Sequence, residues 1–152
     1  MIFKPAQLGM AKLDPQELEA DKKACQKIGP CGVGKKALYL NSFYIDRRYY
    51  LPYGSITRVF KRVAMSSGGF SGKGVFASMA YLVVEYDGGK QKQCNFKDER
   101  DVDALLELLA KRLDEAGVSH FTLQGSTPKP VRAELVRRFN GGEASVFLIS
   151  LR

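Results

Sequence analysis

Basic side chains alternate with aromatic ones in the first half of the chain, a combination that could bind phosphate groups. The basic candidates are Arg47, Arg48, Arg58, Lys61, Arg62 and Lys73, and the aromatic residues of the same stretch are Phe43, Tyr44, Tyr49, Tyr50 and Tyr53. Lys and Arg side chains that contact phosphates give an affinity that falls steeply with salt. The rings could stack on the bases of a single strand, although we expect them to fill a core instead. If the basic side chains converge on one rim, they define a site for an anionic ligand.

The distribution of charge is uneven along the chain, whose formal net charge is +8. Between Lys35 and Lys97 there are eleven Lys or Arg and three acidic residues, whereas the stretch from Asp98 to Asp114 holds six acidic and three basic residues. A basic segment beside an acidic helix indicates either an anionic partner or two neighbouring solvated surfaces. The second interpretation is the simpler one.

The glycine-rich stretch "SSGGFSGKG" contains Gly72 and Lys73 in the order found in phosphate-binding loops. Such a loop also needs a glycine five positions before the second glycine, and a Ser or Thr after the lysine. Ser67 and Gly74 occupy these two positions, and the stretch connects strands instead of opening a helix. We therefore interpret it as the tip of a mobile hairpin, not as an ATP site.

The remaining residue types predict no enzyme, no metal and no cofactor. Cys25, Cys31 and Cys94 form no Cys-x-x-Cys pair and no disulfide framework, and the lone His120 has no carboxylate or cysteine patterned around it. Neither a Ser/His/Asp set nor a convincing carboxylate pair is present. Reduced thiols, the lack of a secretory signal and the lack of an apolar run of about 20 residues predict a cytoplasmic protein without an integral membrane segment.

The elements that would position these residues follow from residue periodicity. Asp14, Pro15 and Glu17 predict a helix start, followed by an apolar stripe of Leu18, Cys25 and Ile28 and by a linker, "GPCGVG". Strands are expected at 37–46, 48–52 and 54–65, then a hairpin that turns at Asp87–Gly89. Asp98 caps an amphipathic helix that runs to Ala116.

The order "LYLNSFYIDRRYYLPYGSITRVFKR" and then "YLVVEYDGGKQKQCNFKDERDVDALLELL" resembles the bacterial pleckstrin-homology-like (PH-like, GRAM-like) domains over about residues 36–113. In this comparison "YLPYGSI" takes the place of a recurring element of the family. The resemblance implies a strongly bent antiparallel sheet, or partial barrel, that the helix caps. Domains of this fold bind lipids or peptides, or have no known ligand.

After Gly117 the pattern changes to strand, helix and strand, which predicts two parallel strands joined by a right-handed crossover. The stretch "LLAKRLDEAGVSHFTLQGSTPKPVRAELVRRFNGGEASVFLISLR" resembles the second RecA-like lobe of Swi/Snf-type helicase-like ATPases. The matching residues are Gly125, Ser126, Thr127, Arg132, Phe139, Asn140, Phe147, Leu148, Ser150 and Leu151.

The sequence also departs from that family. It lacks the glycine turn and the arginine-finger segment that follow in the lobe, and the first lobe with its phosphate loop. Phosphoryl transfer needs a phosphate cradle, a metal-holding acid and a charge-stabilising arginine, so we expect no ATPase activity from this chain alone. Either a naturally short protein or a split helicase gene would account for the match.

Together these patterns predict an α+β protein with an N-terminal helix and linker (1–35), a PH-like domain (36–116) and a truncated helicase-lobe fragment (117–152). Our hypothesis is a noncatalytic PH-like binding module associated with a Swi/Snf-type helicase-like protein. The alternative is a nucleic-acid-binding accessory fragment of a DNA translocase.

The apolar strand at 146–149 needs neighbours on both sides, so we expect the tail to extend a sheet edge, to pack its helix on the barrel, or to pair with a second copy. Partners are thus a protein or a homodimer through the C-terminal strand, with nucleic acid or an anionic headgroup also possible.

Overall fold

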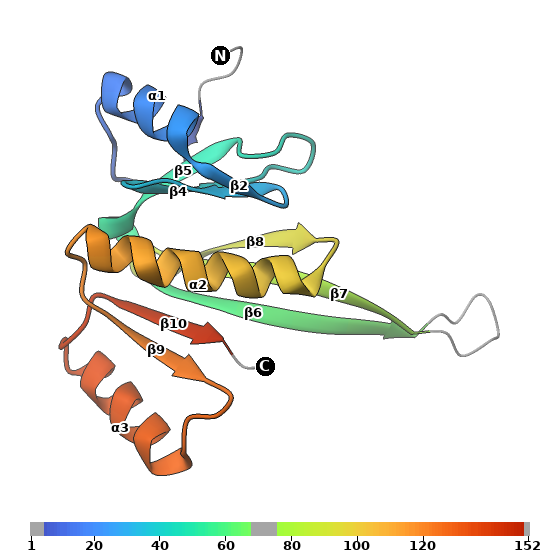
Figure 1. The fold of residues 1–152 in the computed structure, drawn as a ribbon, viewed down its shortest axis with the longest axis vertical. Helices are drawn as coiled ribbons and strands as arrows, with labels where there is room; N and C mark the ends of the chain where they lie inside the picture. The colour runs from blue at the N-terminus through green and yellow to red at the C-terminus, as the bar shows by residue number, and fades with distance from the viewer. Residues whose placement is uncertain (1–4, 68–75, 151–152) are drawn as a thin grey trace.

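Ten strands and three α-helices occur in the part of the chain that the computed structural model describes, residues 5–67 and 76–150. The strands form two sheets of five, here called sheet A and sheet B (Figure 1). This mixed composition confirms the expected α+β class. The long helix α2 (Glu99–Glu115) lies against strands of both sheets.

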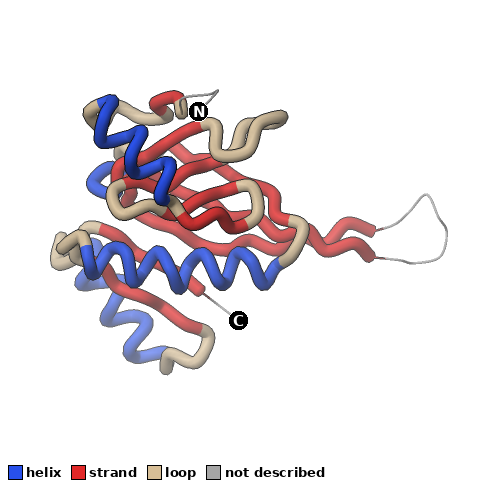
Figure 2. The backbone as a smooth tube through the Cα atoms, turned by 45° about the horizontal axis from the view of Figure 1, so that its top comes forward, coloured by secondary structure: helices blue, strands red, loops and turns tan. Residues whose placement is uncertain are grey.

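Sheet A has the order β1-β5-β4-β3-β2. Its strands are β1 (Ala6–Gln7), β2 (Gln26–Ile28), β3 (Cys31–Val33), β4 (Ala37–Leu40) and β5 (Tyr49–Pro52). The last four pair antiparallel in succession, and β1 joins β5 in parallel. Helix α1 (Pro15–Ala24) covers the outer face of this sheet (Figure 2), where Leu18 packs with Tyr39 and Tyr50.

Sheet B has the order β8-β7-β6-β10-β9. Its strands are β6 (Ile56–Ser67), β7 (Phe76–Tyr86), β8 (Lys90–Phe96), β9 (His120–Gln124) and β10 (Val146–Ser150). The first three form an antiparallel meander, and a 3-10 turn, η1 (Tyr53–Ser55), leads into it from sheet A. The turn between β7 and β8 uses Asp87 and Gly88, whose φ values of 49° and 74° match the predicted hairpin turn.

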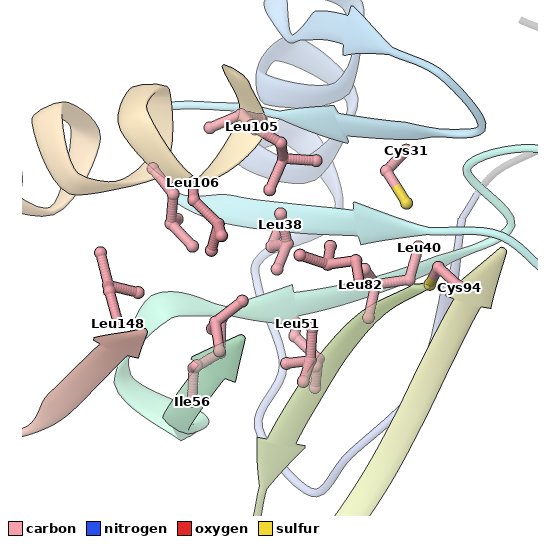
Figure 3. Close-up of a cluster of buried hydrophobic side chains, with 14 of the residues drawn as sticks. Cys31, Leu38, Leu40, Leu51, Ile56, Leu82, Cys94, Leu105, Leu106 and Leu148 are labelled. Atoms are coloured by element: carbon pink, nitrogen blue, oxygen red, sulfur yellow. The ribbon is translucent and has the colours of Figure 1, made fainter. Parts of the chain in front are cut away.

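One core joins the two sheets and α2 (Figure 3). Leu38, Leu40 and Leu51 enter it from sheet A, and Ile56 and Leu82 enter it from sheet B. Leu105 and Leu106 of α2 and Leu148 of β10 complete it. We call the face of sheet B that borders this core its inner face. Because residues of a strand alternate between faces, Phe147 and Ile149 lie on the outer face.

The tail joins sheet B. This is one of the three arrangements that we expected from the sequence. Strand β10 pairs in parallel with β6 on one side and with β9 on the other. Helix α3 (Lys129–Asn140) lies on the side of these strands away from α2 (Figure 1), where the rings of Phe139 and Phe147 are 5.1 Å apart. Strands of the same chain occupy both edges of β10, so pairing of this strand with a second copy is no longer expected.

Several expected boundaries are wrong. The supposed linker "GPCGVG" contains the turn of a hairpin formed by β2 and β3, with Gly29 at φ 55°. Helix α1 ends at Ala24, so Ile28 belongs to a strand. Sheet A therefore crosses the expected division between residues 35 and 36. The strand expected at 37–46 ends at Leu40, because the following residues form a loop.

Helix ends follow the sequence signals more closely. The Asp14 carboxylate accepts hydrogen bonds from the backbone N–H groups of Gln16 and Glu17, and Asp98 accepts one from Arg100. Gly117, at φ 73°, follows the end of α2. Helix α3 has Pro128 as its N-cap, and the hydroxyl of the preceding Thr127 accepts the N–H of Gln124 at 3.0 Å.

Candidate functional site

The predicted basic residues that the structure describes do not form one cluster. Arg47, with φ 50°, donates from Nη1 to the carbonyls of Gly29 (2.9 Å) and Cys31 (3.0 Å), and its side chain is only 15% exposed. It also lies 3.9 Å from the Asp46 carboxylate. These hydrogen bonds connect the loop between β4 and β5 to the hairpin formed by β2 and β3.

Lys61 is on the inner side of β6 and is neutralised by α2. Its Nζ lies 2.8 Å from Glu99 and 3.1 Å from Asp103, and its side chain is 6% exposed. Burial alone would lower the pKa of this amine, but the two carboxylates outweigh that effect and the pKa is raised. Lys61 thus remains charged for an internal ion pair.

Arg58 and Arg62 lie on the outer face of sheet B, beside strand residues that pair with them. The Arg58 guanidinium is 3.8 Å from the Glu85 carboxylate. Arg62 donates from Nη1 to the side-chain oxygen of Gln93 at 2.9 Å and lies 5.5 Å above the ring of Tyr81. These two share a face, but both already have partners within the sheet.

Arg48 lies elsewhere, with its guanidinium carbon 5.8 Å from the centre of the Tyr49 ring. The Lys92 amine approaches the same ring at 5.7 Å. Lys73 is outside the described residues, as is the whole glycine-rich segment from residue 68 to residue 74. Among the described candidates, Arg58 and Arg62 share the outer face of sheet B, whereas the side chains of Arg47 and Arg48 contact different groups.

The loop of residues 41–48, here called the aromatic loop, exposes two large rings. Phe43 and Tyr44 are each 89% exposed, and their ring centres lie 4.7 Å apart in an edge-to-face arrangement with an interplanar angle of 78°. Ile45 beside them is 37% exposed. The expectation that the aromatic residues fill the core is confirmed for Tyr50 and Tyr53 and wrong for this pair.

The aromatic loop has a defined backbone. The N–H of Ser42 donates to the carbonyl of Ile45 at 2.8 Å, and the N–H of Ile45 donates to the Ser42 hydroxyl at 3.0 Å. The N–H of Arg47 donates to the carbonyl of Pro30 at 2.9 Å. These bonds close a tight turn, so the side chains at its tip point outward. Sequence reasoning missed this exposure, although Asn41, Ser42 and Asp46 are turn-forming residues that could have indicated a loop.

Two residues of the Swi/Snf resemblance, Arg132 and Phe139, make contacts that stabilise the tail. Arg132 donates from Nε to the carbonyl of Thr127 at 2.7 Å and from Nη2 to that of Gly125 at 2.6 Å. These bonds fix the connection between β9 and α3. Phe139 docks α3 on the sheet, and Asn140 is the exposed last residue of α3. Leu151 and the side chain of Ser150 are not described.

A pocket of about 500 Å³ lies between α2, β9 and β10. Leu106, Glu107 and Ala110 line it from α2, and Thr122, Gln124 and Ser126 line it from β9 and the following loop. Leu148 contributes from β10. Sequence reasoning did not identify this pocket, because it depends on how β9 is placed against α2.

Two buried polar groups serve the fold. The Asp21 carboxylate, 7% exposed, accepts the N–H groups of Lys35 and Lys36 and the hydroxyl of Tyr39 at 2.7 Å. Burial and this carboxylate raise the pKa of Tyr39. The thiols of Cys31 and Cys94 are both buried, and burial raises the pKa of Cys31. The three cysteines are free.

Over residues 5–67 and 76–150, no three His, Cys, Asp or Glu side chains gather in a way that could hold a metal ion. His120 lies 3.6 Å from the Asp114 carboxylate and 3.3 Å from the carbonyl of Val118. No helix in the described parts of the chain is long and apolar enough to cross a membrane.

Comparisons of this chain with protein-family models, with curated proteins and with solved structures find no match.

Proposed function

We propose that this protein is a noncatalytic binding module of PH-like architecture, and that it attaches to an anionic membrane surface through the aromatic loop. The observation that carries this proposal is the 89% exposure of both Phe43 and Tyr44 on a loop whose backbone is internally hydrogen-bonded. An isolated exposed apolar residue needs no explanation, but two adjacent rings at one loop tip suggest a contact site.

The energetics favour a membrane interface as the partner. Full burial of one large apolar side chain contributes about 1.5–3 kcal/mol, and Tyr and Phe suit the boundary between headgroups and acyl chains. Arg48, in the same loop, would add roughly 1 kcal/mol near anionic lipid. Because the backbone of the loop is already ordered, little conformational entropy is lost on binding.

Vesicle sedimentation tests the proposal. We expect the protein to bind vesicles made of equal parts phosphatidylcholine and phosphatidylserine more strongly than vesicles of phosphatidylcholine alone. The double variant Phe43→Ser/Tyr44→Ser should lose at least about tenfold in affinity, since each 1.4 kcal/mol is a factor of ten. The matched control Val131→Ser/Val136→Ser removes exposed apolar side chains from α3 and should bind like the wild type.

Equal binding of the wild type and the aromatic variant, or no binding to the anionic vesicles, would refute the proposal. The nucleic-acid alternative is tested in parallel with a labelled single-stranded oligonucleotide at two salt concentrations. It is less favoured because Arg58, Lys61 and Arg62 already have partners within the protein. The rings of Phe43 and Tyr44, at 78° to each other, also do not offer parallel faces to successive bases.

We also propose an association with a Swi/Snf-type helicase-like protein. The parallel pair of β9 and β10 with α3 as its crossover supports this relationship, as do the internal contacts of Arg132 and Phe139. An antibody raised against residues 36–113 would report the intact mass of the native protein. A species much larger than 16.9 kDa would favour a covalent link to the helicase-like protein. A single species at 16.9 kDa would count against such a link.

A further inference from the structure

Strand β9 leaves one of its edges open. It is the last strand of sheet B, with β10 on one side, and no strand of residues 5–67 or 76–150 pairs with it on the other. Its sequence, "HFTLQ", contains no Lys and no Pro, two residue types with which proteins often protect an edge strand against pairing. The backbone groups along this edge could therefore pair with another strand.

The hydrogen-bond pattern shows which backbone groups face this open edge. The N–H of Val146 donates to the carbonyl of Ser119 at 3.2 Å. In a parallel ladder, alternate residues bond the same neighbour, so Phe121 also turns its backbone groups toward β10. His120 and Thr122 then turn theirs toward the open edge. Gln124 shares that direction, but its N–H already donates to Thr127.

The open edge runs beside the pocket described above. The side chains of Thr122 and Gln124 line this pocket from β9, and Leu106, Glu107 and Ala110 line it from α2. A strand added to β9 would lie along the mouth of the pocket, and every second side chain would point toward α2. The volume of about 500 Å³ is large enough for a long side chain.

The acidic residues of α2 favour a basic segment as the strand that adds to β9. Helix α2 carries six acidic side chains. Glu99 and Asp103 are paired with Lys61, and Glu107 is the acidic residue among those that line the pocket. Asp114 lies near the start of β9, where its carboxylate is 3.6 Å from His120. The apolar stem of a Lys or Arg could pack on Leu106 and Ala110 while its charged end reaches Glu107.

We propose that β9 and α2 form a docking groove for an extended basic segment of a partner protein, which adds to the open edge of β9 as a further strand and places a Lys or Arg side chain in the pocket. Main-chain hydrogen bonds to His120 and Thr122 would give affinity, and the pocket would give specificity, as in other complexes formed by strand addition. This inference is independent of the aromatic loop.

A second copy of the chain fits this edge less well. Pairing of two β9 strands would place His120, Thr122 and Gln124 of one copy along the edge of the other, and none of these side chains is a Lys or Arg. It would also bring the acidic α2 helices of two copies toward one strand pair, which like charges oppose.

The test uses a short, blocked, fluorescein-labelled peptide in which Lys alternates with Val. We expect saturable binding by fluorescence anisotropy, weakened about tenfold by Glu107→Gln and more by Glu107→Lys. The matched control Glu19→Gln, an exposed acid on α1, should bind like the wild type, as should the Phe43→Ser/Tyr44→Ser variant. The same peptide with Glu in place of Lys should not bind.

Hydrogen exchange distinguishes strand addition from simple charge attraction. The amides of His120 and Thr122 should gain protection when the peptide binds, whereas those of Phe121 and Leu123, already paired with β10, should change little. A peptide N-methylated along one backbone edge, with its charge unchanged, should bind at least about tenfold more weakly. Equal affinity of the methylated peptide, or protection only at residues outside β9, would overturn the proposal. A dimer whose His120 and Thr122 amides are protected without peptide would overturn it as well.

Discussion

Replacing Leu148 by Ala tests whether the tail is integral to the core. Leu148 is 1% exposed and lies in β10, between β6 and β9. It belongs to the same buried cluster as Leu106 of α2 and Leu82 of β7 (Figure 3). If the tail were an appended unit, loss of this side chain would loosen only residues after Gly117.

The expected cost follows from the atoms removed. Three buried carbon groups at about 0.8 kcal/mol each give roughly 2.4 kcal/mol of lost transfer free energy. The cavity that remains between the sheet and α2 adds to this, so we expect the free energy of unfolding to fall by about 3–4 kcal/mol. For a domain of this size each kcal/mol lowers Tm by about 2–4 °C, so the melting temperature should drop by roughly 10 °C.

Urea unfolding is the appropriate assay, followed by circular dichroism and by tyrosine fluorescence because the chain contains no Trp. Both probes should report one transition, with a lower midpoint in Leu148→Ala. The control Val136→Ala, at a position 44% exposed on α3, should change the stability by less than about 0.5 kcal/mol. A loss below about 1 kcal/mol for Leu148→Ala, or an early separate transition of the tail in the wild type, would contradict a shared core.

Three further predictions concern buried polar groups. Asp21→Ala should destabilise the protein by about 2–4 kcal/mol in the same assay, because three donors lose their acceptor; a change below about 0.5 kcal/mol would contradict this role. Lys61→Met should cost about 1 kcal/mol or more, because two carboxylates lose a buried cation. Since the folded state raises the pKa of Lys61, its contribution should persist below pH 10.5 and fade only at higher pH. Among the thiols, Cys25 alone should react with Ellman's reagent in the native protein, slowly because burial raises its pKa. Cys31 and Cys94 should react only in urea, so fast reaction of all three thiols in buffer would refute the described burial.

The local signals in the sequence predicted elements whose ends depend on a few neighbouring residues. Asp14 and Asp98 cap helices as expected, and Asp87 and Gly88 form the expected hairpin turn. Extension of a sheet edge by the last strand was one of three arrangements expected from the sequence, because the run from Val146 to Ile149 has no polar side and needs neighbours. Which edge it joins depends on the tertiary arrangement, and that edge is β6.

Predictions failed where glycine or aromatic content was read without its surroundings. The glycines of "GPCGVG" suggested a linker, but Gly32 and Gly34 belong to or border a strand that packs tightly. A Cβ on Gly34 would lie 2.1 Å from the Asp21 carboxylate, a contact that no local pattern shows. Phe43 and Tyr44 are residue types that favour strands, but the turn from Ser42 to Ile45 directs their side chains outward.

The candidate sites were harder to predict than the fold. Charge counts identified a basic segment, but they could not show that Lys61 is neutralised by α2 or that Arg47 binds carbonyls. The pocket and the open edge of β9 arise only when α2 and the tail come together. Ser126 and Leu148, which line the pocket, are part of the Swi/Snf resemblance, but that pattern gave no indication of a pocket beside α2.

The position of β10 has a consequence for how the protein is made. Strand β6 is synthesised well before its partner β10, because about ninety residues separate Arg58 from Phe147. At elongation rates of about 5–20 residues per second, this delay is roughly 5 to 20 seconds on the ribosome. During that time the nascent chain carries an unpaired edge on β6 and an uncovered apolar side of α2, a state that favours aggregation or chaperone binding. Sheet B can therefore close only after residue 150 has left the exit tunnel.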